Sequence, residues 1–225
     1  LSFIFLLTFS LGFGANYFQH YLQPHSLENL IMPESLILVG IMAQFPLEYP
    51  DNPKTSGNGN FLDLEYEEYN HFYNDTTIMR CDGFLVDRPP HDSLYFQKQL
   101  EAVGNYYLNI SGGNLSYMTQ IITNSNTHNK GYFTVSKGME YYAKSDSLLA
   151  EFFTEVLDSA KTELDIHLST NNFLPEDITF VVFHAGLSQD FSYPSIDPTI
   201  HDLKSAYIDQ EMMQGITPAV IAGDS

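Results

Sequence analysis

The chain has 225 residues and a formal net charge of −19 at pH 7, because 28 Asp and Glu residues stand against only 9 Lys and Arg residues. A surface this acidic repels phosphate backbones and anionic lipid headgroups, which argues against nucleic acid as a partner. The same acidity suits solubility outside the cell or the binding of divalent cations such as calcium, and composition leaves both open. The single cysteine, Cys81, excludes an intrachain disulfide.

The first fifteen residues, LSFIFLLTFSLGFGA, form an uncharged apolar run that ends at small residues and is followed by polar sequence from Asn16. This pattern is typical of a secretory signal peptide, and the run is shorter than the roughly 20 apolar residues of a membrane helix. We therefore expect residues 1–15 to be a signal peptide whose charged n-region is missing, no stable membrane span, and a secreted or extracytoplasmic protein. Residues 16–35 then form an N-terminal lead-in. Residues 36–225 form one domain, which we expect to be truncated because it finishes on the apolar stretch 216–223.

The first predicted element of this domain is a strand at residues 36–45, LILVGIMAQF, because a nearly continuous apolar run between two prolines is typical of a buried strand. Residues 46–60 are rich in Pro, Gly and Asn, which predicts a surface loop. Residues 84–86 predict a short strand, which the prolines after Arg88 would end.

Helical spacing is clear over residues 93–110, where apolar side chains recur at steps of three and four, and Asp92 is placed to cap the start. Residues 115–123 alternate between apolar and polar side chains and predict a second strand. A longer helix is predicted over residues 146–164, with Asp146 as its N-cap.

A short β-branched run at residues 178–183, ITFVVF, predicts a central strand. The order strand, helix, strand, helix, strand requires crossover connections. We therefore predict an α/β fold with a mixed sheet that is at least partly parallel and carries helices on it. The carboxyl ends of such strands gather the functional loops, which here begin near Gln44, Thr123 and His184.

The loop after this last strand carries the candidate site residues. His184 directly follows the buried run and enters a loop with the carboxylates Asp190, Asp197 and Asp202. A polar side chain at this place could contact a substrate or a cation. The alternative is that His184 only hydrogen-bonds a neighbouring turn.

Residues 186–190, GLSQD, partly match the nucleophile elbow G-x-S-x-G of serine hydrolases. Asp190 replaces the final glycine of that motif, and Tyr193 and Pro194 interrupt the helix that should follow it. A serine hydrolase that uses Ser188 is therefore the weakest of the functional hypotheses.

No zinc site can be completed from the sequence, because the eight histidines include no H-x-x-x-H pair and Cys81 has no second thiol. Residues 51–63, DNPKTSGNGNFLD, offer oxygen-bearing side chains and glycines that suit calcium, but their spacing does not match an EF-hand loop. Calcium binding and a plain surface loop both stay open for this segment.

Several segments together resemble the front half of the immune inhibitor A-like family of secreted zinc metallopeptidases. The resemblance spans most of the mature chain and rests on LILVGIMAQFP at 36–46, TSGNGNF at 55–61, DRPPHDSLYFQKQLEAVGNYYLNISGGNLS at 87–116, FVVFHAG at 180–186 and DPTIHDLKSAYID at 197–209. The segment at 87–116 is the most specific of the five.

This resemblance implies a zincin-like fold and peptide hydrolysis that depends on an HExxH helix, in which two His hold zinc and the Glu activates a water. That helix lies downstream of the HAG strand in the family and is not in this sequence. The resemblance therefore implies that residues 36–225 are the N-terminal part of a metallopeptidase-like domain. It further implies zinc in the full-length protein only, a protein or peptide substrate, and no catalytic or zinc-binding residue within this chain.

The alternative is a noncatalytic secreted or surface-binding relative that keeps the scaffold but lacks HExxH. Family members whose HAG loop carries a Glu differ from this chain, which has Gln189 and Asp190 there. Whether the whole protein is an enzyme depends on the helix that the resemblance places downstream.

Overall fold

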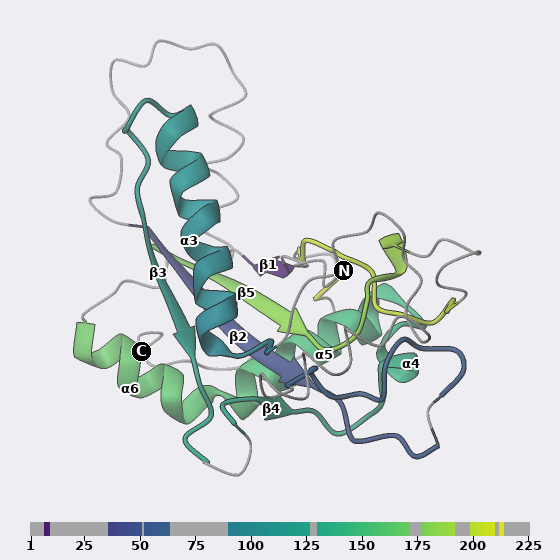
Figure 1. The fold of residues 1–225 in the computed structure, drawn as a ribbon. Coiled ribbons are helices and arrows are strands. Elements are labelled where there is room, and N and C mark those ends of the chain that lie inside the picture. The colour runs from purple at the N-terminus through teal and green to yellow at the C-terminus, as the bar shows by residue number, and fades with distance from the viewer. Residues whose placement is uncertain are drawn as a thin grey trace.

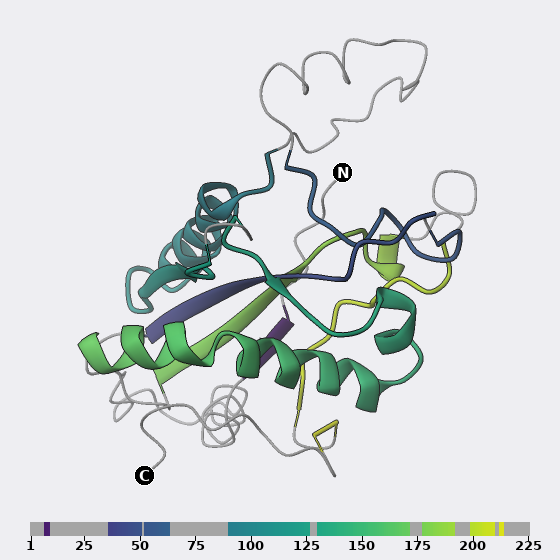
Figure 2. The same ribbon diagram turned by 90° about the horizontal axis from the view of Figure 1, so that it is seen from below.

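The structure is a computed structural model, which describes residues 7–9, 36–50, 52–63, 90–126, 130–171, 177–191, 199–209 and 212–213. These residues form a mixed α/β fold, in which a sheet lies between helices on its two faces (Figure 1, Figure 2). The strands are β1 (Leu7–Phe9), β2 (Leu36–Gln44), β3 (Tyr117–Ile122), β4 (Phe133–Thr134) and β5 (Ile178–His184). The helices are α3 (Ser93–Ile110), α4 (Met139–Tyr142), α5 (Asp146–Ser159), α6 (Lys161–Asn171) and the short 3₁₀ helix η4 (Gln189–Phe191).

The sheet is built around β2. Its strand order is β1-β5-β2-β3, and the short β4 also pairs with β2. β2 runs parallel to β3, β4 and β5, so that Ile37 lies opposite Ile178 on one side and Met118 on the other. β1 pairs with β5 in the antiparallel sense. The predicted mixed, partly parallel sheet with helices packed on it is thus confirmed.

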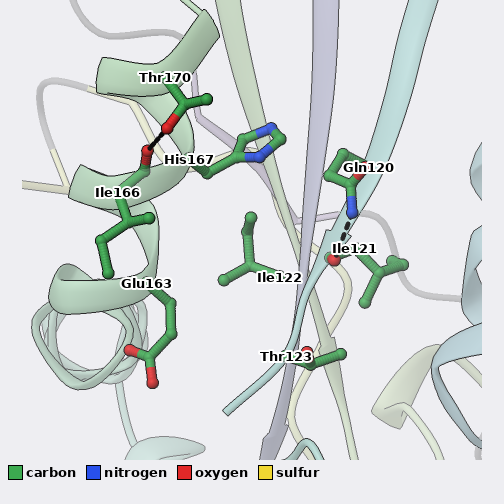
Figure 3. A pocket seen from close by; sticks show the side chains of 8 residues that line it. All are labelled: Gln120, Ile121, Ile122, Thr123, Glu163, Ile166, His167 and Thr170. Atoms are coloured by element: carbon green, nitrogen blue, oxygen red, sulfur yellow. Dashed lines mark hydrogen bonds between the residues drawn. The ribbon is translucent and has the colours of Figure 1, made fainter. Parts of the chain in front are cut away.

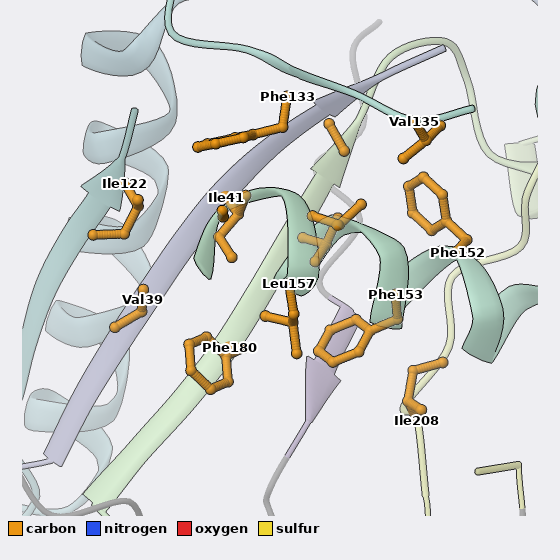
Figure 4. Close-up of a cluster of buried hydrophobic side chains, with 14 of the residues drawn as sticks. Val39, Ile41, Ile122, Phe133, Val135, Phe152, Phe153, Leu157, Phe180 and Ile208 are labelled. Carbon is orange, nitrogen blue, oxygen red and sulfur yellow. The ribbon is translucent and has the colours of Figure 1, made fainter. Parts of the chain in front are cut away.

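Alternate residues of β2 enter two separate cores, because successive side chains of a strand point to opposite faces. Ile37, Val39, Ile41 and Ala43 belong to the core that α5 and α6 cover, and Leu38 and Met42 belong to the core under α3. Figure 4 shows Phe152, Phe153 and Leu157 of α5 facing the strands of the first core. A strand that is buried on both faces has to be apolar at nearly every position, which explains the continuous apolar run in the sequence.

The helix predicted over residues 93–110 is confirmed as α3. Asp92 is its N-cap, and the Asp92 side chain accepts a hydrogen bond from the Tyr95 amide at 2.9 Å. This bond satisfies one of the amides that a helix start leaves without an internal partner. The strands predicted at 36–45, 115–123 and 178–183 are also present, with ends shifted by at most about two residues, as is usual at element boundaries.

The helix predicted over residues 146–164 is two helices, α5 and α6, which meet at Ala160. Ser145 rather than Asp146 is the N-cap of α5, and its hydroxyl accepts a hydrogen bond from a first-turn amide at 3.3 Å. Asp146 is instead the first helical residue, where a negative charge suits the helix dipole. β4 and α4 were not predicted, because they are too short to show a periodic pattern in the sequence. The strand predicted at 84–86 lies outside the described residues.

β1 lies inside the segment that the sequence predicts to be a signal peptide. Its three residues pair with Phe180, Val181 and Val182 of β5. The rest of residues 1–15 and the lead-in 16–35 lie outside the described residues, so the signal peptide stays a prediction. No helix in the described part of the chain is long and apolar enough to cross a membrane.

One side chain of α3 covers the outer edge of β3. Gln97 Nε2 donates to the Thr119 carbonyl oxygen at 3.1 Å, and Gln97 Oε1 accepts from the Ile121 amide at 3.1 Å. In a parallel sheet, one residue of the neighbouring strand donates to a carbonyl and accepts from the amide two residues further along. Thr119 and Ile121 are related in this way. The side-chain amide of Gln97 therefore takes the place of a further strand, and it blocks pairing with another chain at this position.

We predict opposite effects of alanine at two glycines between α3 and the sheet. A Cβ on Gly40 would collide with Ile121 Cδ1 and lie 2.9 Å from Leu100 Cδ1, so Gly40→Ala should lower the free energy of unfolding by about 1–3 kcal/mol. A Cβ on Gly104 would lie 3.6 Å from Thr119 Cγ2, an ordinary contact, so Gly104→Ala should raise that free energy by up to about 1 kcal/mol. Urea denaturation measures both, and equal effects would contradict the described packing.

A second prediction concerns the covered edge. Gln97→Leu removes both edge hydrogen bonds at similar side-chain size, and should lower the free energy of unfolding by about 1–3 kcal/mol and promote self-association. Urea denaturation and analytical ultracentrifugation measure the two effects. Lys98→Ala is the matched control, because Lys98 is exposed on the same helix and pairs only at the surface with Glu101, so it should change stability by less than about 0.5 kcal/mol. If the two variants behave alike, Gln97 does not protect the edge.

Candidate functional site

Three loops meet beyond the carboxyl ends of β2 and β5, where the sequence predicts the functional loops. They are the described parts of residues 45–63 after β2, residues 185–191 after β5, and residues 199–209. Backbone hydrogen bonds join the loops, for example from Gln189 N to Leu203 O at 2.9 Å. We call this region the loop junction.

The centre of the loop junction is the carboxylate of Asp202, which is 1% exposed. Asp202 Oδ1 accepts a hydrogen bond from the Ser56 amide at 2.6 Å, and Oδ2 accepts one from the Thr199 hydroxyl at 2.6 Å. Ser56 Oγ in turn accepts a hydrogen bond from the Leu187 amide at 2.6 Å. A buried carboxylate is costly unless it is hydrogen-bonded, so these donors are required. Asp202 and Ser56 thereby hold the three loops together.

A tight turn at Gly186 brings the loop after β5 against Ser56. The φ angle of Gly186 is 90°, a left-handed conformation that side chains rarely adopt. A Cβ on Gly186 would also lie 2.9 Å from the Ser56 carbonyl oxygen and collide with Met139 Cε. Glycine is therefore required here for two reasons. The HAG sequence ends β5 and begins the turn that carries Leu187 to Ser56.

His184 lies at the end of β5 and is 7% exposed. Its Nδ1 lies 3.0 Å from the carbonyl oxygen of Ala185, and its ring meets the rings of Phe45 and Phe152 edge-on. Burial lowers the pKa of His184, so the ring is neutral near pH 7. The contact with Ala185 agrees with the alternative that His184 hydrogen-bonds a neighbouring turn. A substrate contact by His184 stays a prediction.

Asp190 lies in η4 and is held by two serines. Asp190 Oδ2 accepts hydrogen bonds from the Ser205 amide at 2.8 Å and from the Ser188 hydroxyl at 3.0 Å. Partial burial opposes ionisation, but the hydrogen bonds from Ser205 and Ser188 and the charge of Lys204 outweigh it and lower the pKa of Asp190. Asp190 is therefore an anion that fastens the third loop to the loop after β5.

The environment of Ser188 does not suit a nucleophile. The side chain is fully buried, its hydroxyl donates to Asp190, and Ser205 Oγ lies 3.4 Å away. A nucleophilic serine needs an adjacent base within hydrogen-bond reach, most often a histidine. Within the described residues, the printed partners of the Ser188 hydroxyl are the carboxylate and the backbone amide of Asp190 and the hydroxyl of Ser205, so the serine hydrolase hypothesis gains no support.

The structure brings Asp190 and Asp202 into the loop junction and places His184 at its base, whereas Asp197 lies outside the described residues. Within the described ranges, no three His, Cys, Asp or Glu side chains are arranged to share a metal ion. The oxygens of Asp202 and Oδ2 of Asp190 are already engaged by protein donors. The described residues therefore do not form a zinc site.

The segment considered for calcium, residues 51–63, is fastened to Glu140 of α4. Glu140 Oε2 accepts a hydrogen bond from Asn52 Nδ2 at 2.9 Å, and Oε1 pairs with Lys54 Nζ at 2.9 Å. The hydrogen bonds from Lys54 and Asn52 lower the pKa of Glu140 to about 2. A cation at this carboxylate would have to displace the lysine ammonium, so calcium binding by this segment stays a prediction without a matching contact.

The sequence analysis did not identify Ser56 and Ser205, which connect the loops. Ser56 lies 146 positions from Asp202 in the chain, and a local pattern does not reveal so distant a hydrogen bond. The composition around Ser56 predicts only a turn-rich loop. One signal could have identified both serines. Ser56 lies in TSGNGNF and Ser205 lies in DPTIHDLKSAYID, two of the segments that carry the family resemblance.

The buried His184 predicts a loss of stability in mild acid. Because its pKa is lowered in the folded state, the unfolded state takes up a proton first as the pH falls below about 6.5. The contribution of His184 to the free energy of unfolding should therefore be level above about pH 7.5 and fall, by up to about 1.4 kcal/mol per pH unit, as the pH drops below about 6.5. Urea denaturation across this range measures it.

His184→Gln should remove this part of the slope, whereas His201→Gln, a change at a partly exposed histidine of the same junction, should keep it. Parallel pH profiles for the wild-type protein and His184→Gln would contradict the described burial of His184.

Comparisons with known proteins give no relative from which a function could be transferred. No family model, no curated protein and no solved structure matches the chain.

Proposed function

We propose that this chain is the N-terminal part of a secreted zinc metallopeptidase-like domain, with the zinc ligands outside this sequence. One observation carries the proposal. Ser56 of TSGNGNF bonds to Asp202 of DPTIHDLKSAYID and to Leu187, the residue that directly follows FVVFHAG, so segments that resemble the immune inhibitor A-like family and lie far apart in the chain come together at one point. The parallel pairing of β2 and β5 brings these loops to one edge of the sheet, and the buried hydrogen bonds between the resembling segments support the proposal.

The sheet supports the same proposal at a coarser level. The resemblance implies a zincin-like arrangement of a mixed sheet with helices, and β2, β3 and β5 are parallel neighbours with helices on both faces. The FVVFHAG segment forms the carboxyl-terminal part of β5 and the start of the turn that follows it. In this proposal β5 and its turn form the scaffold against which the downstream helix packs.

The role of this chain is scaffolding and substrate positioning, since its described residues do not fit a zinc ion. Zinc bound by the downstream helix would activate the water that attacks a peptide bond. What the described residues supply is a rigid floor, because the carboxylates of Asp202 and Asp190 lock three loops together beside that place. By itself the chain should not cleave peptides.

The contacts of Asp190 favour the noncatalytic alternative. Some members of the family carry a Glu in the loop after HAG, where this chain has Asp190. Here Asp190 Oδ2 accepts hydrogen bonds from the Ser188 hydroxyl and the Ser205 amide. A carboxylate used in this way stabilises the loop rather than assisting chemistry. A secreted binding protein that retains the scaffold without HExxH would show the same junction.

The test is to read the coding sequence that follows Ser225, express the full-length protein, and assay it on a denatured protein substrate with and without a zinc chelator. We expect an HExxH helix, about one zinc per molecule, and cleavage that the chelator abolishes and added zinc restores. Changing the glutamate of that helix to glutamine should reduce cleavage by at least about 1,000-fold while zinc stays bound. A downstream helix without those residues, together with no zinc and no cleavage, would establish the noncatalytic alternative instead.

A further inference from the structure

A second site lies away from the loop junction, between β3 and α6. A cavity of about 280 Å³ opens there to the surface (Figure 3). The strand side includes Gln120, Ile122 and Thr123, and the helix side includes Glu163, Ile166 and His167. Ligand pockets commonly span about 300–1,000 Å³, so a space of this size suits one amino-acid side chain or a small molecule.

The helix spacing explains why α6 lines a cavity. Leu164 and Leu168 are one turn apart and are buried in the core. Glu163 and His167 are also one turn apart and lie beside that stripe, and Figure 3 shows them on the side of α6 that faces β3. Ile166 is 64% exposed at the same site. The helix thus presents one carboxylate, one imidazole and one apolar side chain to the cavity.

Glu163 supplies the charge of the cavity. Its Oε1 accepts hydrogen bonds from the Ser125 amide at 3.0 Å and the Ser125 hydroxyl at 2.8 Å. Burial opposes ionisation, but these bonds outweigh it and lower the pKa of Glu163, so the side chain is an anion at neutral pH. Burial lowers the pKa of His167, which is therefore neutral. Among the described residues that line the cavity there is no Lys or Arg, so the cavity is negative.

The hydrogen bonds of Glu163 select the kind of cation. Because Oε1 already accepts two bonds from Ser125, Oε2 is the oxygen that remains for an outside donor. A guanidinium binds best to both oxygens of a carboxylate, whereas an ammonium acts as a point charge on one. Ile122 and Ile166 supply apolar surface on which an alkyl stem can lie while its charged end reaches Glu163.

We propose that this cavity binds an aliphatic ammonium group, carried by a lysine side chain of a partner segment or by a free alkyl amine. The ammonium pairs with Glu163 and the alkyl stem lies against Ile122 and Ile166. The net charge of −19 draws such cations to the protein. Met118, which is 53% exposed and shares a face of β3 with Gln120, extends the apolar surface beyond the cavity and favours the lysine of a longer segment. The site uses no residue of the loop junction and is independent of the proposed peptidase function.

The first test is an NMR titration of the full-length, ¹⁵N-labelled protein with N-acetyl-lysine methylamide and with its neutral norleucine and guanidinium-bearing arginine counterparts. We expect amide shifts confined to residues 120–125 and 163–170. We also expect a dissociation constant for the lysine compound at least about 10-fold lower than for the norleucine compound and about 3-fold lower than for the arginine compound. Equal affinity for lysine and norleucine compounds, or shifts elsewhere only, would overturn the proposal.

Two variants separate the charge from the apolar wall. Glu163→Gln retains an oxygen for Ser125 and removes the charge, and should weaken the lysine compound at least about 10-fold with little effect on the norleucine compound. Ile166→Ser changes an exposed side chain, leaves folding intact and should weaken both compounds about 3-fold. Glu101→Gln, at a carboxylate on α3 that pairs with Lys98, is the matched control and should change neither. Unchanged lysine affinity in both cavity variants would overturn the site.

A last comparison identifies the source of the ammonium. If the natural ligand is a protein segment, a pentapeptide with a central lysine between apolar residues should bind at least about 5-fold more tightly than n-pentylamine. The reason is that the apolar residues of the peptide also cover Met118. Equal binding of the two would assign the site to small amines. Failure of both to bind would refute the proposal, while leaving the peptidase assay of the downstream helix unaffected.

Discussion

Strand β2 is buried on both of its faces, and this constraint governs the rest of the structure. It has parallel neighbours on both sides, so each connection has to cross from one end of the sheet to the other and leaves a helix on a face. α3 covers one face, and α5 and α6 cover the other. Gly40 is the one position of β2 without a side chain, and the space is taken by Leu100 of α3 and Ile121 of β3. The close approach of α3 to the sheet depends on that glycine.

The same arrangement determines where polar chemistry can collect. With both faces of the sheet covered, the ends of the strands are where the loops meet, and the loops after β2 and β5 come together because those strands are adjacent and parallel. The junction cannot be apolar, since loop backbones carry amides and carbonyls that need partners. Asp202 meets this need with a buried carboxyl group that accepts hydrogen bonds from Ser56 of a neighbouring loop and from Thr199 of its own loop. Such an arrangement holds the loops in one geometry.

Sequence reasoning succeeded where a local rule decides the structure. The helix at 93–110 follows from its periodicity and from Asp92, and the strands at 36–45 and 178–183 follow from continuous apolar runs. The sequence predicts one helix where the structure has α5 and α6, because the apolar stripe continues through Ala160. The helical hydrogen bonding of α5 nevertheless ends at Ala160, which is its C-cap. Sequence reasoning named Asp190 and Asp202 as candidate residues but not their hydrogen-bond partners, because donors such as Ser56 and Ser205 lie at distant positions in the chain.

The two edges of the sheet differ in a way that bears on the proposed function. At β3 the side chain of Gln97 bonds the Thr119 carbonyl and the Ile121 amide, so a further strand could not pair with β3 at this position. At β5 the edge is covered by the backbone of β1 over three residues, and β1 belongs to the segment that the sequence predicts to be removed on export. Removal of that segment would leave Phe180, Val181 and Val182 of β5 open to another strand. The edge that β1 covers therefore belongs to the same strand whose carboxyl end carries the loop junction.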